Sequence, residues 1–284
     1  MKAGALNEPD IETSIDIKTM RKAAKAAGKL ALDYFRSDAV ETWDKAPGHP
    51  VTEADIEVNA LLADKLQSAR PEYGWLSEET VDDLSGRGRD RIWVVDPIDG
   101  TRAFMRSDPD WCVAIALVER GQAIASAIYA PVFDELYLAQ AGKGAFLNDE
   151  PISVSDQSKE RGMRLITNRS LVEHPGWPEP WPKLTVSDPK PNATLYRMAL
   201  VASGRWDATL ALFRKSDWDL AAGTLLVEEA GGLATTHLGA AFRFNQEVPE
   251  QMSMVAAGKA LHPLLVRRVK QVRLPDPNLG AAAR

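Results

Sequence analysis

The spacing of apolar residues predicts helices near both ends of the chain and in its second half. In residues 15–36 apolar side chains recur every three or four positions, which is the period of an α-helix. A second helix is expected over about 54–68, with Thr52 as its N-cap and Asp55 three residues later. The remaining helices are expected over 194–204, over 219–230 with Gly231-Gly232 closing it, and near 261–272.

Short apolar runs between these helices predict strands. Residues 92–95 are continuously apolar, and we expect this strand to stop at Asp96-Pro97. Residues 111–147 then predict a meander with turns such as Glu119-Arg120-Gly121. The strands of the meander and those after it are expected over 111–118, 123–129, 136–139, 145–147, 164–167, 233–236 and 252–256.

The order of these elements predicts the fold class. Helical pairs that alternate with antiparallel sheet indicate stacked α and β layers, an α/β arrangement other than a Rossmann domain. Residues 1–13 are expected to form a flexible N-terminal extension and residues 14–284 a single domain, with a subdomain division near residue 150 as the alternative. Surface loops are expected over 45–50 and over the Pro- and Trp-rich stretch 174–191.

Composition and charge narrow the classes of protein. Hydrophobic residues make up 45% and charged residues 26%, which is ordinary for a soluble globular protein. We expect no membrane association, because no apolar run could span a bilayer and no signal peptide is recognisable. The net charge of −6 argues against a nucleic-acid partner. The single cysteine, Cys112, excludes an internal disulfide and favours a cytoplasmic location.

Carboxylates gather at the ends of three predicted elements. The segments are Ser77-Glu78-Glu79, Asp96-Pro97-Ile98-Asp99-Gly100-Thr101 and Ser216-Asp217-Trp218-Asp219. The four histidines, by contrast, lack the paired spacing of a zinc site, so oxygen ligands would have to bind any metal.

The middle segment carries the strongest chemical signal. Pro97 fixes φ between Asp96 and Asp99, so their carboxylates can converge on one point. Gly100 lets the backbone approach a ligand closely, and the amides of Gly100 and Thr101 can face phosphate oxygens. Hard carboxylate oxygens suit Mg²⁺, which proteins often share with a substrate phosphate.

Structural explanations compete at each residue taken alone. Asp55 and Asp219 would also serve as helix caps, and Glu78-Glu79 would also suit a solvated loop. The cluster Arg87, Arg89 and Arg91 is expected in a solvated loop, and Cys112 in the core. The joint pattern of acids is what favours a functional site.

Four segments carry a family resemblance. They are Val51-Thr52-Glu53-Ala54-Asp55, Trp75-Leu76-Ser77-Glu78-Glu79, Trp93-Val94-Val95-Asp96-Pro97-Ile98-Asp99-Gly100-Thr101, and Trp218-Asp219-Leu220-Ala221-Ala222-Gly223 with Glu229-Ala230-Gly231-Gly232 after it. Together they resemble the inositol monophosphatase superfamily of lithium-sensitive, magnesium-dependent phosphomonoesterases. The match covers roughly residues 15–270, in the order and spacing of the family.

The resemblance implies a fold and a metal site. The fold would be a layered αβαβα sandwich. Glu78, Asp96 and the carbonyl of Ile98 would bind a first Mg²⁺, and Asp96, Asp99 and Asp219 would bind a second, with two or three ions in all. The first ion would make hydroxide available near neutral pH, and the second would stabilise the leaving-group oxygen.

The resemblance also implies catalytic roles. Thr101, paired with Asp55, would orient and deprotonate the attacking water, with Glu78 close by. Gly100 and Thr101 would bind the phosphate, and Glu79 would support the metal ligands from behind. The partner would be a small-molecule phosphate monoester, and the chain would form a homodimer.

Departures from the inositol branch bear on the substrate. Ser77 replaces a glycine, Leu212 stands where that branch has a glutamate that contacts the inositol ring, and Asn192-Ala193 replaces a Gly-Ser/Thr pair. Ser77-Glu78-Glu79, Asp110-Trp111 and the basic Arg197 resemble the 3′-phosphoadenosine 5′-phosphate (bisphosphate) nucleotidases, which favours that branch, with some activity on inositol monophosphate. The alternatives are a histidinol-phosphate or fructose-1,6-bisphosphate phosphatase, and a non-catalytic binding partner of the transcription machinery.

Overall fold

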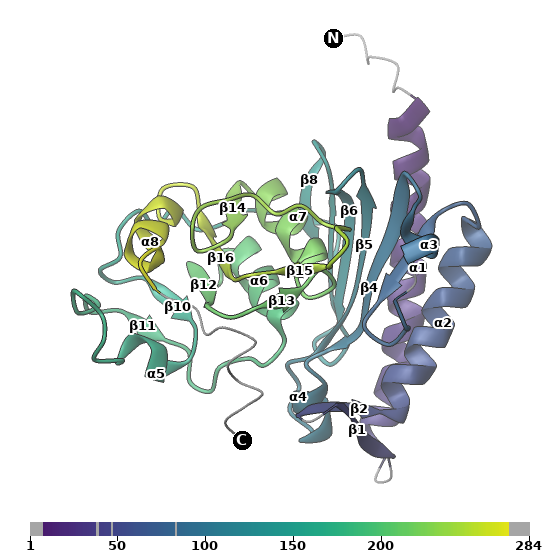
Figure 1. The fold of residues 1–284 in the computed structure, drawn as a ribbon, viewed down its shortest axis with the longest axis horizontal. Coiled ribbons are helices and arrows are strands. Elements are labelled where there is room, and N and C mark those ends of the chain that lie inside the picture. The colour runs from purple at the N-terminus through teal and green to yellow at the C-terminus, as the bar shows by residue number, and fades with distance from the viewer. Residues whose placement is uncertain (1–7, 38–39, 47, 83, 273–284) are drawn as a thin grey trace.

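Helical layers and sheets alternate through the molecule (Figure 1). The computed structural model describes residues 8–37, 40–46, 48–82 and 84–272. Helices α1 (Glu8–Phe35) and α2 (Glu53–Ala69) cover one face of a seven-stranded sheet. Between that sheet and a five-stranded sheet lie α6 (Thr194–Ala202) and α7 (Ala221–Glu229), and α8 (His262–Val269) covers the far side. The expected αβαβα sandwich is therefore confirmed.

The two sheets differ in how their strands pair. In the seven-stranded sheet only the first pair is parallel, and the strand order is β3 (Gly74–Ser77), β4 (Arg91–Asp99), β5 (Cys112–Glu119), β6 (Gln122–Ala130), β7 (Glu135–Gln140), β8 (Gly144–Leu147) and β9 (Glu150–Ile152). The five-stranded sheet is mixed, in the order β11 (Thr185–Val186), β10 (Arg164–Ile166), β12 (Ala208–Ala211), β16 (Met254–Gly258) and β14 (Gly232–Thr235). The smaller elements are β1 (Thr42–Ala46), β2 (His49–Thr52), α3 (Leu84–Arg87), α4 (Thr101–Met105), α5 (Arg169–Val172), β13 (Lys215–Ser216) and β15 (Glu250–Gln251).

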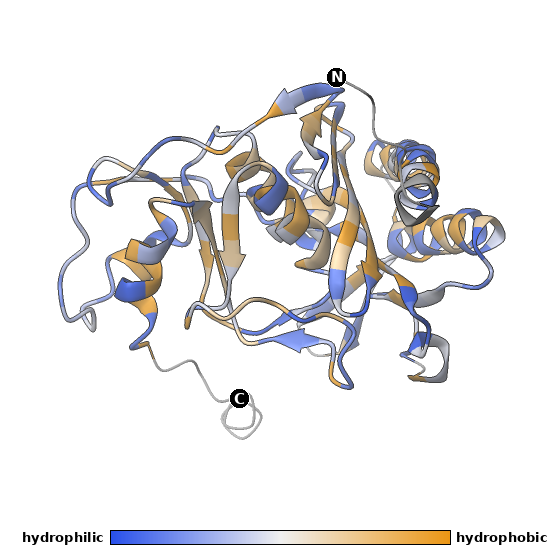
Figure 2. Cartoon of the chain, turned by 90° about the horizontal axis from the view of Figure 1, so that it is seen from above, coloured by the Kyte–Doolittle hydropathy of each residue, from blue (hydrophilic) through white to orange (hydrophobic). Residues whose placement is uncertain are grey.

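Burial on both faces explains why the central strands are apolar without interruption. Along β5, Val113 and Ile115 point into the core under α1 and α2, whereas Ala114 and Ala116 point into the core around α6 and α7. A further core lies between the five-stranded sheet and α8. Figure 2 shows hydrophobic stretches, in orange, along the strands and the helices.

The expected strand end at Asp96-Pro97 is wrong, because β4 continues to Asp99. Asp96 pairs with Ala114 and Asp99 with Cys112, so two residues of β4 lie opposite one residue of β5. This bulge contains Pro97, whose missing N–H would break a regular ladder but is tolerated at a bulge. The irregularity therefore carries both aspartates to the end of the same strand.

Helix α1 begins at Glu8, earlier than expected. Residues 8–13 are therefore helical and do not belong to the expected extension, while residues 1–7 lie outside the described part of the chain. Arg91 stabilises the first turns of α1, because its guanidinium lies 3.0 Å from the carboxylate of Glu12. The expected solvated arginine cluster is correspondingly wrong for Arg87 and Arg91, which are both buried, and Arg91 also pairs with an acid of β5 at 2.8 Å.

Some elements were not predicted from the apolar pattern. The β1–β2 hairpin occupies most of the expected loop 45–50, whose residue 47 lies outside the described residues. Strands β9 and β12, which have three and four residues, were also not predicted. The expected loop 174–191 contains the two-residue β11. No described helix is long and apolar enough to cross a bilayer.

We predict that Gly28→Ala destabilises the protein by roughly 1–3 kcal/mol, although alanine ordinarily favours helices. The added Cβ would clash with the Tyr129 ring, where α1 packs on β6. Urea unfolding followed by circular dichroism measures the change. The matched control is Gly86→Ala, since nothing lies within 4 Å of a Cβ there. Equal stability of Gly28→Ala and the wild type would contradict the close packing.

Candidate active site

The fold brings carboxylates from distant segments to one place. Asp96 and Asp99 lie at the end of β4, and Asp219 lies in the turn that leads into α7. One carboxylate oxygen from each of the three lies within 4.8 Å of the others, a grouping that could hold a metal ion. Glu78 follows β3, which runs parallel to β4, and its amide donates to the Val95 carbonyl at 3.3 Å.

The hydrogen bonds between the described residues leave a buried acceptor of this aspartate cluster without a partner. Asp99 accepts bonds from the amides of Thr194, at 3.0 Å, and Leu195. Asp219 accepts from the amide of Ser216 at 3.0 Å and lies 3.1 Å from the Lys215 ammonium. Asp96 is buried, and its Oδ1 has no hydrogen-bond partner among the described residues. Buried acceptors are normally satisfied, so this atom fits a metal ligand.

Burial and mutual repulsion disfavour the ionised carboxylates. Burial, and then the charge of Asp219, raise the pKa of Asp99 to about 6. The pKa of Asp96 is raised well above its usual range by burial and then by Glu78 and Asp99. The pKa of Glu78 rises to about 7 by burial, although Lys45 opposes the change. A bound divalent cation would reverse these shifts, so the donor set fits Mg²⁺.

Lys45 brings a positive charge to Glu78 and Glu79. Its ammonium lies 3.0 Å from Glu78 and also bonds Glu79. Within the described residues, Glu78 is outside the close aspartate triad, and Glu79 is more buried than Glu78. Sequence reasoning missed Lys45, because a single lysine in an expected loop carries no signal.

Asp55 both caps α2 and faces the site. Its Oδ2 accepts a bond from the amide of Thr52 at 2.8 Å, so the expected capping box is present. Its Oδ1 accepts from the hydroxyl of Thr101 at 3.3 Å, and the same hydroxyl lies 3.2 Å from the carbonyl oxygen of Ile98. Burial raises the pKa of Asp55 to about 6 despite the bonds from Thr52. The capping and functional explanations are therefore compatible.

Gly100 joins the acids of β4 to α4. Its φ is +98°, and an added Cβ would lie 3.1 Å from the Cβ of Ala193 and 3.3 Å from the carbonyl oxygen of Asp110. Both the backbone conformation and the neighbouring atoms therefore require glycine. As a result, Thr101 follows the metal-binding candidates without an intervening loop.

Arg197 lies on α6 beside this cluster. It is 3% exposed, and its guanidinium donates to the hydroxyl of Thr194 at 2.9 Å and to the carbonyl of Ala193 at 3.2 Å. A cavity of about 320 Å³ is lined by Arg197 and Leu212. Arg197 and Leu212, the two positions that the sequence analysis associated with the substrate, thus line the same cavity.

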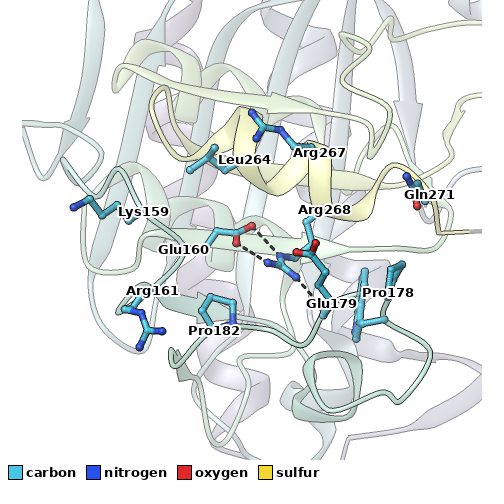
Figure 3. Close-up of a pocket in the computed structure, with 11 residues that line it drawn as sticks. Lys159, Glu160, Arg161, Pro178, Glu179, Pro182, Leu264, Arg267, Arg268 and Gln271 are labelled. Atoms are coloured by element: carbon cyan, nitrogen blue, oxygen red, sulfur yellow. Dashed lines mark hydrogen bonds and ion pairs between the residues drawn. The ribbon is translucent and has the colours of Figure 1, made fainter.

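A larger cavity, of about 530 Å³, lies between α8 and residues 159–182 (Figure 3). None of the acidic site residues lines it. Arg268 is bound there by Glu160 through two bonds of 2.7 and 2.8 Å and by the carbonyl of Glu179 at 3.1 Å. The acids, and not cavity size, therefore locate the candidate site.

A buried carboxylate cluster with a hydroxyl–carboxylate pair beside it is typical of a hydrolase that acts with divalent metal ions. Residues 13–274 match the sequence model of the inositol monophosphatase family. The chain therefore belongs to the inositol monophosphatase family. The enzymes of this family are metal-dependent phosphomonoesterases, and the aspartate triad could bind such a metal.

Similar proteins cover nearly the whole chain. A histidinol-phosphatase of Chlorobaculum parvum is 32% identical over 92% of this chain and 96% of its own length. An inositol-1-monophosphatase of Mesorhizobium japonicum is 31% identical, with coverages of 90% and 96%. A Nus factor SuhB of Xylella fastidiosa is 33% identical, with coverages of 87% and 92%. The crystal structure of the extragenic suppressor protein suhB from Bartonella henselae has a TM-score of 0.76 at 28% identity and covers 90% of this chain and 98% of that one.

We predict that Mg²⁺ stabilises the wild type but not Asp96→Asn. At about 100 times the Kd, a ligand adds roughly 2.7 kcal/mol, or about 5–10 °C in Tm for a chain of this size. The metal-free variant should melt at or above the metal-free wild type, because one buried charge is gone. Differential scanning fluorimetry with and without EDTA measures both effects. Asp156→Asn, at an exposed position, should respond to Mg²⁺ like the wild type.

We predict that Mg²⁺ affinity falls as pH falls from 7.5 to 5.5. The pKa of Asp99, about 6, and that of Glu78, about 7, lie above the usual carboxyl values, so protons compete with the metal in this window. Each competing proton lowers the Mg²⁺ affinity by up to about tenfold per pH unit. In the metal-free protein, these groups stabilise the fold most at low pH, and this contribution is lost as pH rises through 6 to 7. Isothermal titration calorimetry at both pH values tests this, and equal affinities would contradict it.

Proposed function

We propose that the chain hydrolyses a small-molecule phosphate monoester with two or three Mg²⁺ ions, and that 3′-phosphoadenosine 5′-phosphate is preferred over inositol monophosphate. The observation that carries the proposal is the aspartate triad, of which Asp96 and Asp99 are buried and in which Asp96 Oδ1 has no partner among the described residues. Such a cluster is stable at neutral pH only with compensating positive charge.

The proposed metal ligands come from three segments. Glu78, Asp96 and the Ile98 carbonyl would hold one Mg²⁺, and Asp96, Asp99 and Asp219 would hold another. When bound, the ions acidify water and neutralise charge on the phosphoryl group. Support comes from the placement of the triad and from the common edge that β3 and β4 share.

The remaining site residues would handle the water and the phosphate. The Thr101 hydroxyl donates to Asp55, so its oxygen is free to accept a bond from water and orient it. The raised pKa of Asp55, about 6, suits a group that accepts a proton near neutral pH. The amides of Gly100 and Thr101 would bind phosphate oxygens, and Glu79 would support Glu78 through Lys45, which contacts both acids. No covalent intermediate is needed.

The substrate preference rests on the cavity beside Arg197. Leu212 offers no acceptor to inositol hydroxyls, whereas the Arg197 guanidinium can bind an anion. Asp110 Oδ2 accepts the amide of Asn192 at 2.7 Å, which supports a structural role for Asp110 at the start of α6. We place the enzyme in the cytoplasm as a homodimer, in agreement with its single cysteine and its family.

The relatives supply two alternatives. Similarity to a histidinol-phosphatase supports histidinol phosphate as an alternative substrate. Phosphate release should therefore be measured from histidinol phosphate and from fructose 1,6-bisphosphate as well. Similarity to a Nus factor supports a binding role in the transcription machinery. If Asp96→Asn still co-precipitated proteins of the transcription machinery, this would favour that second role, since such binding does not require the metal ligands.

We predict Mg²⁺-dependent phosphate release from 3′-phosphoadenosine 5′-phosphate, faster than from inositol 1-phosphate. Asp96→Asn and Asp219→Asn should each lower kcat by at least about 100-fold, because each removes a metal ligand. Phosphate release with and without EDTA measures this. Asp156→Asn should retain near-normal turnover, and near-normal turnover of Asp96→Asn would refute the assigned metal ligands.

A further inference from the structure

The cavity beside the aspartate triad contains two cations and no carboxylate. Besides Lys190 and Arg197, its lining consists of Thr167, Asn168, Ser170, Leu171 and His174 and of the segment 210–213. Its volume of about 320 Å³ is within the usual range for small-ligand sites. The space therefore presents positive charge to whatever enters it.

Neither cation has a carboxylate within 4.0 Å in the described part of the chain. Arg197 is buried and bonds only the uncharged oxygens of Ala193 and Thr194. The ammonium of the half-buried Lys190 donates to the Pro191 carbonyl at 3.3 Å. Buried cations are normally paired with acids, so this arrangement leaves an anion-binding capacity unused.

Other buried arginines of the same protein provide the contrast. Arg87 lies 2.6 Å from a carboxylate oxygen of Asp82, and Arg91 lies 2.8 Å from one of Glu119. The fold therefore supplies acids to buried arginines where they have a structural role. Arg197 is an exception, and it is also one that lines a cavity.

The two cations lie close to the proposed reaction centre. The amide of Thr194 donates to Asp99 Oδ1 at 3.0 Å, while its hydroxyl accepts from Arg197 at 2.9 Å. Burial, and then the charges of Arg197 and Lys215, lower the pKa of Lys190 to about 8, although the carboxylates of Asp99 and Asp110 oppose the change. Lys190 is therefore mostly protonated at pH 7.

We propose that Lys190 and Arg197 bind a second anionic group of the substrate. This inference rests on the proposed function, and it defines the substrate class as phosphate monoesters that carry a further phosphate or carboxylate. The reacting phosphate would lie at the aspartate triad, and the second anion would enter the cavity. Lys190 is then a specificity-determining residue, which the sequence did not reveal.

The test compares two substrates that differ by one phosphate, 3′-phosphoadenosine 5′-phosphate (that is, adenosine 3′,5′-bisphosphate) and adenosine 3′-monophosphate. For Lys190→Gln we expect kcat/KM on the bisphosphate to fall about 10- to 100-fold, mainly through KM, and kcat/KM on the monophosphate to change less than about twofold. Arg197→Lys, which keeps the charge but loses the fork of donors, should give a smaller loss in the same direction. Lys143→Gln removes an exposed lysine that does not line the cavity and should change neither value.

The outcomes separate this inference from the proposed function. No Mg²⁺-dependent release by the wild type from any ester would overturn the proposed function and this inference with it. Wild-type activity confined to esters without a second anion would overturn the inference alone. Equal losses on both nucleotides, or no loss, in Lys190→Gln would also overturn it. If fructose 1,6-bisphosphate is the better substrate, its comparison with fructose 1-phosphate is decided by the same criterion.

Discussion

The burial of several carboxylates within a few ångströms of one another is the constraint on which the rest of this structure depends. Asp96 is 1% exposed and Asp99 is 5% exposed, and both have raised pKa values because burial and neighbouring acids oppose ionisation. Backbone amides at the start of α6 offset part of this cost at Asp99. The remaining cost of ionisation is greatest at Asp96, whose Oδ1 has no partner among the described residues. A bound cation would offset this cost.

Two features of the backbone make this cluster achievable. The bulge at Pro97 carries both aspartates to the end of one strand, and the positive φ of Gly100 turns the chain directly into α4. The third acid comes from a turn that is itself fixed, because buried Asp217 accepts the amide of Asn245 at 2.6 Å and the side chain of Gln251 at 2.9 Å. The layered fold then holds α6 and α7 between the sheets, so these turns keep their positions.

Sequence reasoning succeeded where a strong period or a chemical motif was present. The central strands were predictable because they are buried on both faces, and the Thr52–Asp55 capping box follows from local spacing. The end of β4 was not predictable, since a proline in a bulge resembles a proline that ends a strand. Lys45 and Lys190 were missed for another reason: their importance arises from residues that are close in space and distant in sequence.

The charges around Thr194 explain why catalysis and specificity can be built from separate parts of one site. Acids at strand ends form a negative centre that requires cations, whereas Lys190 and Arg197 form a positive centre that requires an anion. Thr194 touches both, through its amide to Asp99 and its hydroxyl to Arg197. Metal ions at the first centre would attract one phosphate, and a second anion would compensate the other centre. A substrate with two anionic groups therefore neutralises both halves of the site, and an uncharged leaving group would leave the second half uncompensated.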